Sequence, residues 1–295
     1  MRIVDKRDIA IMRAMDGLRE RYEWIPLSKL HEKLPFKGRE INKRISDLAR
    51  MNLIVLRNVP SFGEVCSRLT ERGLDTLALW DLRNHGAIGE IGDVVACGKE
   101  ATILISKRGR KAVAVKLHRY YSQEFKKIEK SLAYMAIRIR GSELKIDEFE
   151  IDVPRAKAQI EMHSLEVLRS KVNVPKPLGL NRHAVAMEMI TRDKVPAPQL
   201  NKVVVEDAEE AFHTILDDYK KMVENGVVHG DFNEFNVLVS EDDEFYYIDF
   251  PQSVHPEYSG SEELIRRDIS RISAHFSNKY RIDVQAAGEL IKELT

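Results

Sequence analysis

Three side chains in the last third of the sequence have types and spacing suited to chemistry on a phosphate group. The stretch 227–236 is Val-Val-His-Gly-Asp-Phe-Asn-Glu-Phe-Asn, so Asn236 follows Asp231 by five residues, and Asp249 comes two strand-like segments later. One carboxylate can take the proton of an acceptor hydroxyl, while an amide and a second carboxylate can hold Mg²⁺ on nucleotide phosphates. The pattern is typical of a kinase core and predicts Asp231 as the base and Asn236 and Asp249 as metal ligands. A structural aspartate or a helix N-cap would explain either aspartate alone.

An earlier strand supplies a lysine of the kind that binds nucleotide phosphates. Lys116 ends the run Ala-Val-Ala-Val-Lys, which matches the Val-Ala-Ile-Lys element of kinases. Its ammonium is expected to contact the α- and β-phosphates of ATP and to pair with a glutamate on a helix. Glu161 lies at the expected place on the next helix, and Glu166 is the competing candidate.

Two backbone segments are expected to complete a nucleotide site. Gly98, Lys99 and Glu100 lie one hairpin before Lys116, where a kinase has a loop with three glycines over the phosphates. The run Met-Glu-Met-Ile at 187–190 follows a strand and is predicted to bond adenine through its main chain. A plain buried strand end is the alternative explanation for that run.

These side chains need a strand layer for the lysine and a helical layer for the loops. Periodicity predicts strands at 94–97, 102–106 and 112–117, a helix at 154–169, a strand at 184–190, a helix at 208–225, short strands at 237–239 and 245–248, and a helical tail at 262–295. The prediction is an α+β fold with a trimmed, bilobal, kinase-like domain at 93–295. Its N-lobe would span about 93–187 and its C-lobe about 191–295.

The first 84 residues have a different pattern. They contain a helix around Ile9, a short helix at 27–33, a basic helix at 39–51, strands at 53–57 and 64–69 and a further helix, which is the order of a winged helix. Arg39, Lys43 and Arg50 lie off the apolar stripe of the basic helix and are predicted to contact nucleic acid. A solvated face and a protein partner are the alternatives.

Charge supports a division of the chain. Residues 1–85 carry 17 Lys and Arg against 12 Asp and Glu, although the whole chain has zero net charge. A basic first domain favours a partner that bears phosphates. Residues 85–92 are predicted to be a linker.

Composition points to an ordinary globular protein. The 295 residues are 43% hydrophobic and 32% charged. The apolar runs are shorter than a membrane span, and the N-terminal residues lack the apolar core of a signal peptide. Cys66 and Cys97 have neither a disulfide framework nor a metal-ligand spacing. We therefore expect a cytoplasmic protein without membrane contact.

The stretch 119–151 has no clear period and mixes basic and acidic residues. A long insertion after a strand is more often functional than accidental. Ser122 lies just past the strand end and is predicted to be an autophosphorylation site, with Ser131 as the alternative.

The combined motifs resemble the RIO family of atypical serine protein kinases, in the branch with an N-terminal winged helix. The resemblance spans nearly the whole chain. It rests on Gly98-Lys99-Glu100, on Val227-Val228-His229-Gly230-Asp231 and on Ile248-Asp249-Phe250-Pro251-Gln252. Departures from the residues usual in the family are Ala96, Ala101 and the pair Asn233-Glu234.

The resemblance implies an ATP- and Mg²⁺-dependent serine kinase, with Mn²⁺ as an alternative metal, that acts in maturation of the small ribosomal subunit. It also implies autophosphorylation on serine and an ATPase activity in which the metal-binding aspartate is transiently phosphorylated. The winged helix would contact the pre-ribosomal small subunit and its rRNA. The implied site consists of the catalytic Asp231, the metal ligands Asn236 and Asp249, the ion pair of Lys116 with Glu161, and the hinge residues Glu188 and Ile190.

Two other functions are compatible with parts of the pattern. Small-molecule kinases of the aminoglycoside or choline type share His-Gly-Asp with a downstream Asn and Asp, but they usually have a larger helical C-lobe and no winged helix. A nucleic-acid-binding regulator with an inactive kinase lobe is disfavoured, because Lys116, Asp231, Asn236 and Asp249 are all present.

The segment after Asp249 separates this sequence from ordinary protein kinases. A helical pattern begins by about Ser261, which leaves no room for an activation loop. Gly230 stands where other kinases have the basic residue that meets an activation-loop phosphate. We expect His229 to hold the loop by hydrogen bonding, and we expect no control by loop phosphorylation.

Overall fold

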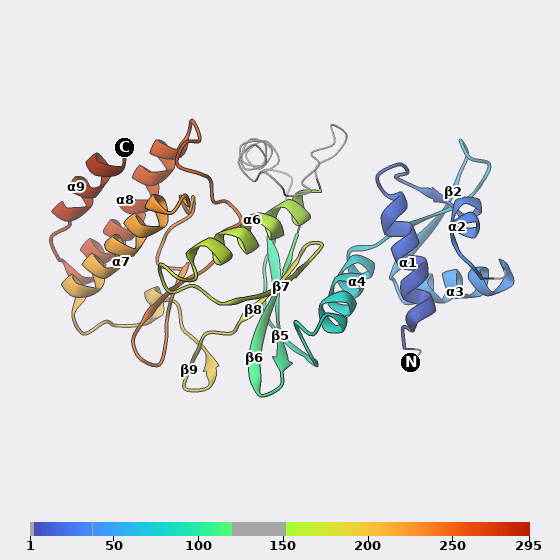
Figure 1. Cartoon of the computed structure of the whole chain (residues 1–295), viewed down its shortest axis with the longest axis horizontal. Coiled ribbons are helices and arrows are strands. Elements are labelled where there is room, and N and C mark those ends of the chain that lie inside the picture. Colours follow the sequence, from blue (N-terminus) through green and yellow to red (C-terminus); the bar gives the residue numbers. More distant parts are fainter. Residues whose placement is uncertain (1–2, 37, 120–151) are drawn as a thin grey trace. The chain divides into compact units, whose positions relative to one another are not determined.

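The computed structural model describes residues 3–36, 38–119 and 152–295. They divide between His85 and Gly86 into two compact units, each with its own hydrophobic core (Figure 1). Both units combine helices with antiparallel strands, in agreement with the predicted α+β class.

The N-terminal unit has the order of elements predicted for a winged helix. Its elements are α1 (Lys6–Leu18), β1 (Ile25–Pro26), α2 (Leu27–Lys33), α3 (Gly38–Arg50), β2 (Ile54–Val59), β3 (Glu64–Leu69) and α4 (Glu71–Asn84). The strands pair in the order β1-β3-β2, so the β2–β3 hairpin forms the wing. Two of these helices have a side-chain N-cap: Asp5 accepts hydrogen bonds from the first turn of α1, and Thr70 accepts one from the first turn of α4.

Helix α3 is held by an apolar stripe and by one arginine. The buried residues of α3 are Ile41, Ile45 and Leu48. The guanidinium of Arg44 bonds to Asp5 and Asp8 at the start of α1, over 2.8–2.9 Å. Arg44 is therefore part of the framework that fixes α3 against α1, and its charge is already used inside the domain.

The second unit begins with a five-stranded antiparallel sheet. The strands β4 (Ile91–Cys97), β5 (Ala101–Arg108), β6 (Lys111–His118), β7 (Pro177–Asn181) and β8 (Ala184–Glu188) have the order β4-β5-β6-β8-β7. Helix α6 (Val153–Leu168) packs on this sheet (Figure 1). Because β6 is the central strand, Lys116 has neighbours in register on both sides, Ile103 and Val185.

The remainder of this unit is mainly helical. Its elements are β9 (Thr191–Arg192), β10 (Val195–Pro196), a 3₁₀ turn at Leu200–Lys202, α7 (Ala208–Glu224), β11 (Val237–Val239), β12 (Phe245–Tyr247), α8 (Ser261–Tyr280) and α9 (Gln285–Leu294). Helices α7, α8 and α9 lie side by side (Figure 1). Their shared core contains the rings of Phe232, Tyr247, Phe250 and Phe276, so the segments beside Asp231 and Asp249 are anchored in it.

Besides the two-residue strands β1, β9 and β10, which were not predicted, three elements differ from the sequence-based prediction. Strand β7 was not predicted, because its run Pro-Leu-Gly-Leu-Asn looks like a turn and becomes a strand by pairing with β8. Strand β4 begins inside the predicted linker, since Ile91 pairs with Ser106 of β5. The predicted helical tail breaks into two helices at Arg281, whose φ is 59°.

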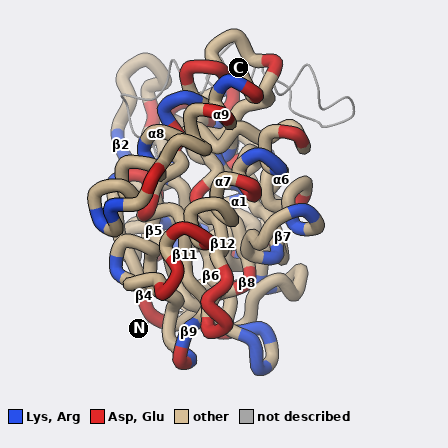
Figure 2. The backbone as a smooth tube through the Cα atoms, turned by 90° about the vertical axis from the view of Figure 1, so that its left-hand side faces the viewer, with Lys and Arg blue, Asp and Glu red and all other residues tan. Residues whose placement is uncertain are grey.

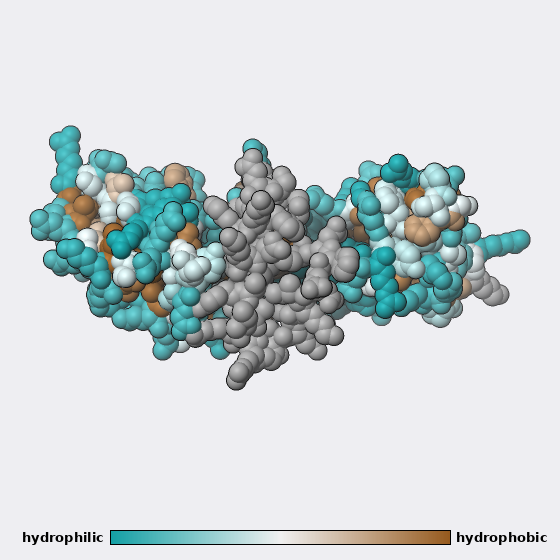
Figure 3. All heavy atoms as spheres, turned by 90° about the horizontal axis from the view of Figure 1, so that it is seen from above, coloured by the Kyte–Doolittle hydropathy of each residue, from teal (hydrophilic) through white to brown (hydrophobic). Residues whose placement is uncertain are grey.

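Hydrophilic residues dominate the face seen in Figure 3, where hydrophobic residues form small separate patches. The backbone tube carries charges of both signs (Figure 2), and the turn at 241–244 between β11 and β12 is entirely acidic. Within the described ranges, no helix is both long enough and apolar enough to cross a bilayer.

Candidate active site

Lys116 lies between two carboxylates at the centre of the second unit. Its Nζ is 2.6 Å from Glu161 Oε1 on α6 and 2.7 Å from Asp249 Oδ1 after β12. The competing Glu166 is exposed on α6. The fold therefore brings together three charged residues from segments that are far apart in the sequence.

His118 extends this group by one residue. Its Nε2 is 2.7 Å from Glu161 Oε2, so each oxygen of Glu161 has a partner. The His118 ring is buried, and burial lowers its pKa by more than the neighbouring carboxylate raises it. Neutral His118 then donates its Nε2–H to Glu161 and fixes the carboxylate that faces Lys116.

The charges in this group favour one another. Burial has the largest single effect and by itself would raise the pKa of Glu161 and of Asp249. The surrounding groups together outweigh burial, with Lys116 foremost for both carboxylates and His118 next for Glu161, and they hold both pKa values below their ordinary range. Burial alone would lower the pKa of Lys116, and the two carboxylates raise it instead. With His118 neutral, two anions surround one cation, which is an arrangement that attracts a further positive charge.

Asp249 has an unusual backbone. Its φ is 73°, in the left-handed region that residues other than glycine seldom adopt. Its neighbours fix this conformation, since Ile248 N donates to Asn236 O over 3.0 Å and Phe250 is fully buried. Strained residues cluster at functional sites, and here the conformation directs a carboxylate that is 43% exposed toward Lys116.

Hydrogen bonds from the side chains of His229 and Asn236 fix the loop that contains Asp231. His229 donates from Nε2 to Ile248 O over 3.0 Å and accepts from Asp231 N at Nδ1 over 3.3 Å, so it holds the loop as expected. Asn236 Nδ2 donates to Asp231 O over 2.8 Å and lies 3.3 Å from Asp231 Oδ2. These bonds use the amide nitrogen of Asn236 and leave its side-chain oxygen for the metal ion that the sequence predicts here.

Helix α8 anchors the same loop through the buried side chain of Asp268. Asp268 accepts from Gly230 N over 2.7 Å, from Phe232 N over 3.1 Å and from Tyr219 OH over 3.1 Å. Gly230 has a φ of +78°, and a Cβ there would lie 2.5 Å from Gln252 O. The close approach of the chain explains why a glycine precedes Asp231 in this protein.

Arg271 of α8 contacts the predicted base directly. Its Nη1 is 2.5 Å from Asp231 Oδ1, and both side chains are partly exposed. One oxygen of Asp231 therefore bonds to a guanidinium and the other lies near an amide. An acceptor hydroxyl that approaches Asp231 has to displace or share the Arg271 contact.

The predicted phosphate loop is a tight turn between β4 and β5. Gly98 N donates to Ala101 O over 2.9 Å, while Lys99 is exposed. Glu100 forms an ion pair of 3.5 Å with Lys157, a fully buried lysine of α6. Glu100 thus connects the loop to α6.

The predicted hinge lies at the end of β8. Glu188 N donates to Lys176 O over 2.9 Å, and Ile190 O accepts from Ala197 N over 3.0 Å. These bonds account for the amide of Glu188 and the carbonyl of Ile190. The prediction assigns adenine to the main chain of these two residues, and the carbonyl of Glu188 and the amide of Ile190 are their other main-chain polar groups.

The donor set fits Mg²⁺ better than a transition metal. The described residues contain no cluster of three or more His, Cys, Asp or Glu that would cage an ion. Mg²⁺ is typically held by one or two protein oxygens together with phosphates and water. Asn236 and the half-exposed Asp249 supply that number of oxygens.

The remaining predicted residues lie elsewhere. Arg39 and Lys43 are exposed on α3, and neither forms an ion pair within the described chain. Arg50 is exposed and pairs with Asp47. Ser122 and Ser131 lie outside the described residues.

Sequence reasoning missed His118, Asp268 and Arg271. Asp268 had a detectable signal, because it interrupts the apolar stripe that Ile265, Ile269 and Ile272 form on α8. A charged residue on a buried face needs specific partners. His118 and Arg271 had no comparable signal, since their partners come from distant segments.

The sheet with its central lysine, the helix glutamate and the paired aspartate loops define a phosphotransferase fold of the protein-kinase type. Comparison with known families then assigns the chain. The family model described as "RIO domain" matches residues 102–287, and the model "Rio2, N-terminal" matches residues 1–85. The chain belongs to the RIO family of kinases, in the branch with an N-terminal winged helix.

Individual relatives agree with this assignment. The chain is 30% identical to the RIO-type serine/threonine-protein kinase Rio2 of Methanocaldococcus jannaschii, over 89% of this chain and 93% of that protein. It is 28% identical to the serine/threonine-protein kinase rio2 of Schizosaccharomyces pombe, over 95% and 78%. The Rio2 kinase from Chaetomium thermophilum, in a structure described as an ADP/Mg²⁺–phosphoaspartate complex, shares the fold with a TM-score of 0.78 and 23% identity, over 99% of this chain and 86% of that one. The small-molecule kinase alternative is not favoured by these matches.

Proposed function

We propose that this protein transfers the γ-phosphoryl group of ATP, with Mg²⁺, to serine hydroxyls of protein substrates. The observation that carries the proposal is the position of Lys116, within 2.7 Å of both Glu161 and Asp249. Kinases need a lysine paired with a helix glutamate beside a metal-binding aspartate. The relatives named as serine/threonine-protein kinases support the same activity.

Each residue has a role in this proposal. Lys116 contacts the α- and β-phosphates, and Glu161 with His118 keeps its ammonium in place. Asp231 accepts the serine proton while serine Oγ bonds to the γ-phosphorus and the bond to the bridging oxygen of ADP breaks. Asn236 and Asp249 hold Mg²⁺, which neutralises negative charge on the phosphates.

The nucleotide is completed by main-chain contacts. The carbonyl of Glu188 and the amide of Ile190 bond adenine, and the turn of Gly98, Lys99 and Glu100 covers the phosphates. Since Glu100 pairs with Lys157, the turn and helix α6 position the nucleotide together. This proposal predicts that Lys99, which is exposed, contributes to phosphate binding.

A test separates the base from the metal ligand. In Asp231→Ala, phosphotransfer should fall by roughly 10²–10⁴-fold because a positioned base is lost, while the affinity for ADP with Mg²⁺ stays nearly unchanged. In Asp249→Ala, the Mg²⁺ dependence of nucleotide binding should disappear. Asp242→Ala, in the exposed acidic turn, is the matched control. An Asp231→Ala protein with normal phosphotransfer would refute the mechanism.

A second activity is suggested by the phosphoaspartate in the Chaetomium thermophilum structure. In this alternative an Asp249 oxygen attacks the γ-phosphorus, ADP leaves, and water later hydrolyses the acyl phosphate to inorganic phosphate. Trapping with hydroxylamine or borohydride, followed by peptide mapping, should then mark Asp249. Recovery of serine phosphate alone, with substrate phosphorylated much faster than ATP is hydrolysed, would exclude it.

We further propose a role in maturation of the small ribosomal subunit in the cytoplasm. The family resemblance implies this role, and the basic first domain is compatible with rRNA as its partner. Arg39, Lys43 and Arg50, all exposed on α3, would contact the RNA phosphates. Nucleotide turnover measured with and without purified pre-ribosomal particles tests the role, because a particle that leaves the rate unchanged would speak against it.

A further inference from the structure

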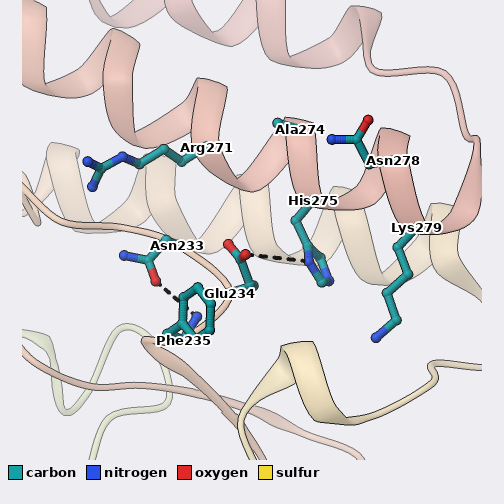
Figure 4. A pocket seen from close by; sticks show the side chains of 8 residues that line it. All are labelled: Asn233, Glu234, Phe235, Arg271, Ala274, His275, Asn278 and Lys279. Carbon is teal, nitrogen blue, oxygen red and sulfur yellow. Dashed lines mark hydrogen bonds and ion pairs between the residues drawn. The ribbon is translucent and has the colours of Figure 1, made fainter.

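A pocket of about 690 Å³ lies between the loop after Asp231 and helix α8. The loop contributes residues 233–235, and α8 contributes a face that carries Arg271, Ala274 and His275 (Figure 4). None of the residues assigned above to the nucleotide lines this pocket. It is therefore available to a second substrate.

Two lining residues connect the pocket to the predicted base. Arg271 Nη1 is 2.5 Å from Asp231 Oδ1, and Asn233 Nδ2 donates to Asp231 O over 2.8 Å. A molecule in the pocket consequently lies next to the carboxylate that takes the acceptor proton. A second substrate of a kinase has to occupy such a place.

His275 lines the pocket, and one of its ring nitrogens has no hydrogen-bond partner among the described residues. Its side chain is only 8% exposed, and its Nδ1 lies 3.9 Å from Glu234 Oε1. Its Nε2 is buried without a hydrogen-bond partner in the described part of the chain. Burial lowers the pKa of His275, so the ring adds no positive charge to the pocket wall. Because this nitrogen has almost no exposed surface, a ligand in the pocket reaches it only after the ring turns.

Phe235 supplies an apolar contact. Phe235 belongs to the loop of Asp231 and is 49% exposed. Its main chain is fixed, because its amide donates to Asn233 Oδ1 and its carbonyl accepts from Gln199 Nε2, both over 2.9 Å. The ring is thus held at the pocket across from Ala274 of α8 (Figure 4). Phe235 offers an apolar surface on the loop wall of the pocket, and Ala274 adds a small apolar side chain on the α8 wall.

The two cationic side chains that line the pocket, Arg271 and Lys279, already form hydrogen bonds within the protein. Arg271 bonds to Asp231, and Lys279 Nζ bonds to the carbonyls of Asn201 and Val203 over 3.2 and 2.6 Å. Glu234 adds a negative charge to the wall. A phosphate backbone would find little attraction here, whereas a peptide requires only hydrogen bonds and an apolar contact.

We propose that this pocket is the acceptor subsite, which seats an apolar side chain of a peptide on Phe235 and Ala274 while a neighbouring serine reaches Asp231. The proposal rests on the kinase function proposed above. On entry the peptide displaces Arg271 from Asp231. Serine Oγ then bonds to the γ-phosphorus, ADP leaves, and the serine proton passes to Asp231.

A set of synthetic peptides tests this subsite. Each carries one serine in an alanine–glycine background, with a single Phe at one position from two residues before to two residues after the serine. With the full-length protein, ATP and Mg²⁺, we expect Phe at one position to lower KM about tenfold relative to the Ala peptide, because a phenyl ring becomes buried. The value of kcat should change little.

Variants of the pocket should remove this preference. Ala274→Trp fills the pocket and should raise KM for the best peptide at least about tenfold, while the affinity for ADP with Mg²⁺ stays the same. Phe235→Ala removes the apolar contact and serves as an independent second variant. Glu263→Trp places the same ring on an exposed position of α8 about 16 Å away and should preserve the preference.

Four results would overturn the acceptor subsite in a protein that does phosphorylate peptides. They are a preference for acidic residues, no positional preference, a preference that survives both pocket variants, and competition by polyuridylate RNA that Ala274→Trp abolishes. Failure of the kinase function itself appears differently, as phosphotransfer that persists in Asp231→Ala. A wild-type protein that hydrolyses ATP through Asp231 but phosphorylates no peptide would refute the subsite and leave the ATPase alternative.

Discussion

At the scale of single residues, the group around Lys116 has a high desolvation cost, and each of its charges has a partner of opposite sign or a hydrogen bond. Moving charges out of water has a large cost, which only good geometry and complete hydrogen bonding offset. Glu161 uses both oxygens, one for Lys116 and one for His118, and Lys116 reaches Asp249 as well. Removing any one partner leaves a buried charge uncompensated, so these residues act as a unit.

His118 gives this unit a pH dependence. Its pKa in the folded protein lies below the ordinary value of about 6.5, so the unfolded chain binds a proton more readily as the pH falls. The contribution of His118 to the free energy of unfolding is therefore fully present above about pH 6.5, and it is lost as the pH falls toward the pKa of the folded state. We expect the free energy of unfolding to drop between about pH 7 and pH 5, and to drop less in His118→Gln.

Urea denaturation of both proteins at the two pH values measures this effect. Gln at position 118 keeps an N–H for Glu161 but has no titrating ring. His213→Gln, in an exposed position on α7, is the matched control and should behave like the wild type. Equal pH dependence in wild type and His118→Gln would contradict the assignment.

Residue identity and spacing predicted much of the site. Asp231, Asn236, Asp249 and Lys116 were expected because kinase chemistry fixes their types and order, and their roles remain predictions. Glu161 was predicted as the partner of Lys116 with Glu166 left open, and packing separates the two, because Glu161 lies 2.6 Å from Lys116 whereas Glu166 is exposed. His118 could not be found, because its value depends on a partner 43 positions away.

At the scale of elements, helix α8 supports the loop that contains Asp231. Asp268 satisfies two backbone amides of the loop, Gly230 N and Phe232 N. In Asp268→Ala both buried amides lose their acceptor, and the free energy of unfolding should fall by about 2–4 kcal/mol. Chemical denaturation measures this change, and phosphotransfer should fall with it.

Asp268→Asn is the informative comparison. It retains one acceptor oxygen, so its stability should lie between those of wild type and Asp268→Ala. Glu262→Ala, at an exposed position in the first turn of α8, should be neutral. Wild-type stability in Asp268→Ala would show that the loop is held by other contacts.

Helix α3 is the corresponding element of the first unit. If Arg39, Lys43 and Arg50 contact RNA phosphates, changing all three to Glu should weaken RNA binding and flatten its salt dependence. Each lost contact lowers the log–log salt slope by roughly 0.7–0.9. Binding titrations at several salt concentrations measure the slope.

A matched triple variant tests the specificity of this face. Lys29, Arg57 and Arg68 carry the same number of charges elsewhere in the unit, and changing them to Glu should affect RNA binding less. Phosphotransfer should be normal in both proteins. An unchanged slope in the α3 variant would favour a solvated face or a protein partner.

Local patterns located most elements but not their interruptions. The helix at Leu27–Lys33 and the strands at Glu64–Leu69 and Val237–Val239 lie where periodicity and turn residues place them. Strand β7 escaped prediction because pairing with β8 defines it. The break at Arg281 escaped as well, because apolar residues continue on both sides.

At the scale of the whole molecule, the chain consists of two units with independent cores. A unit with its own core is expected to fold alone. We predict that a fragment of residues 1–85 unfolds cooperatively by heat, and that a fragment of residues 86–295 binds ADP with Mg²⁺ within about threefold of the full chain. Circular dichroism and calorimetric titration measure the two properties. A fragment 1–85 without a cooperative transition would contradict the division.

The two hydrogen bonds of Glu161, one to Lys116 and one to His118, have a consequence for inhibitors. Many kinases switch off when the helix that carries this glutamate moves outward and breaks the lysine pair, because helix position controls that pair. Here such a movement would break the bond to His118 as well as the bond to Lys116. Compounds that require a pocket behind a displaced helix would have to open it against both bonds. Selective ligands for this protein should therefore be sought among molecules that accept the closed arrangement.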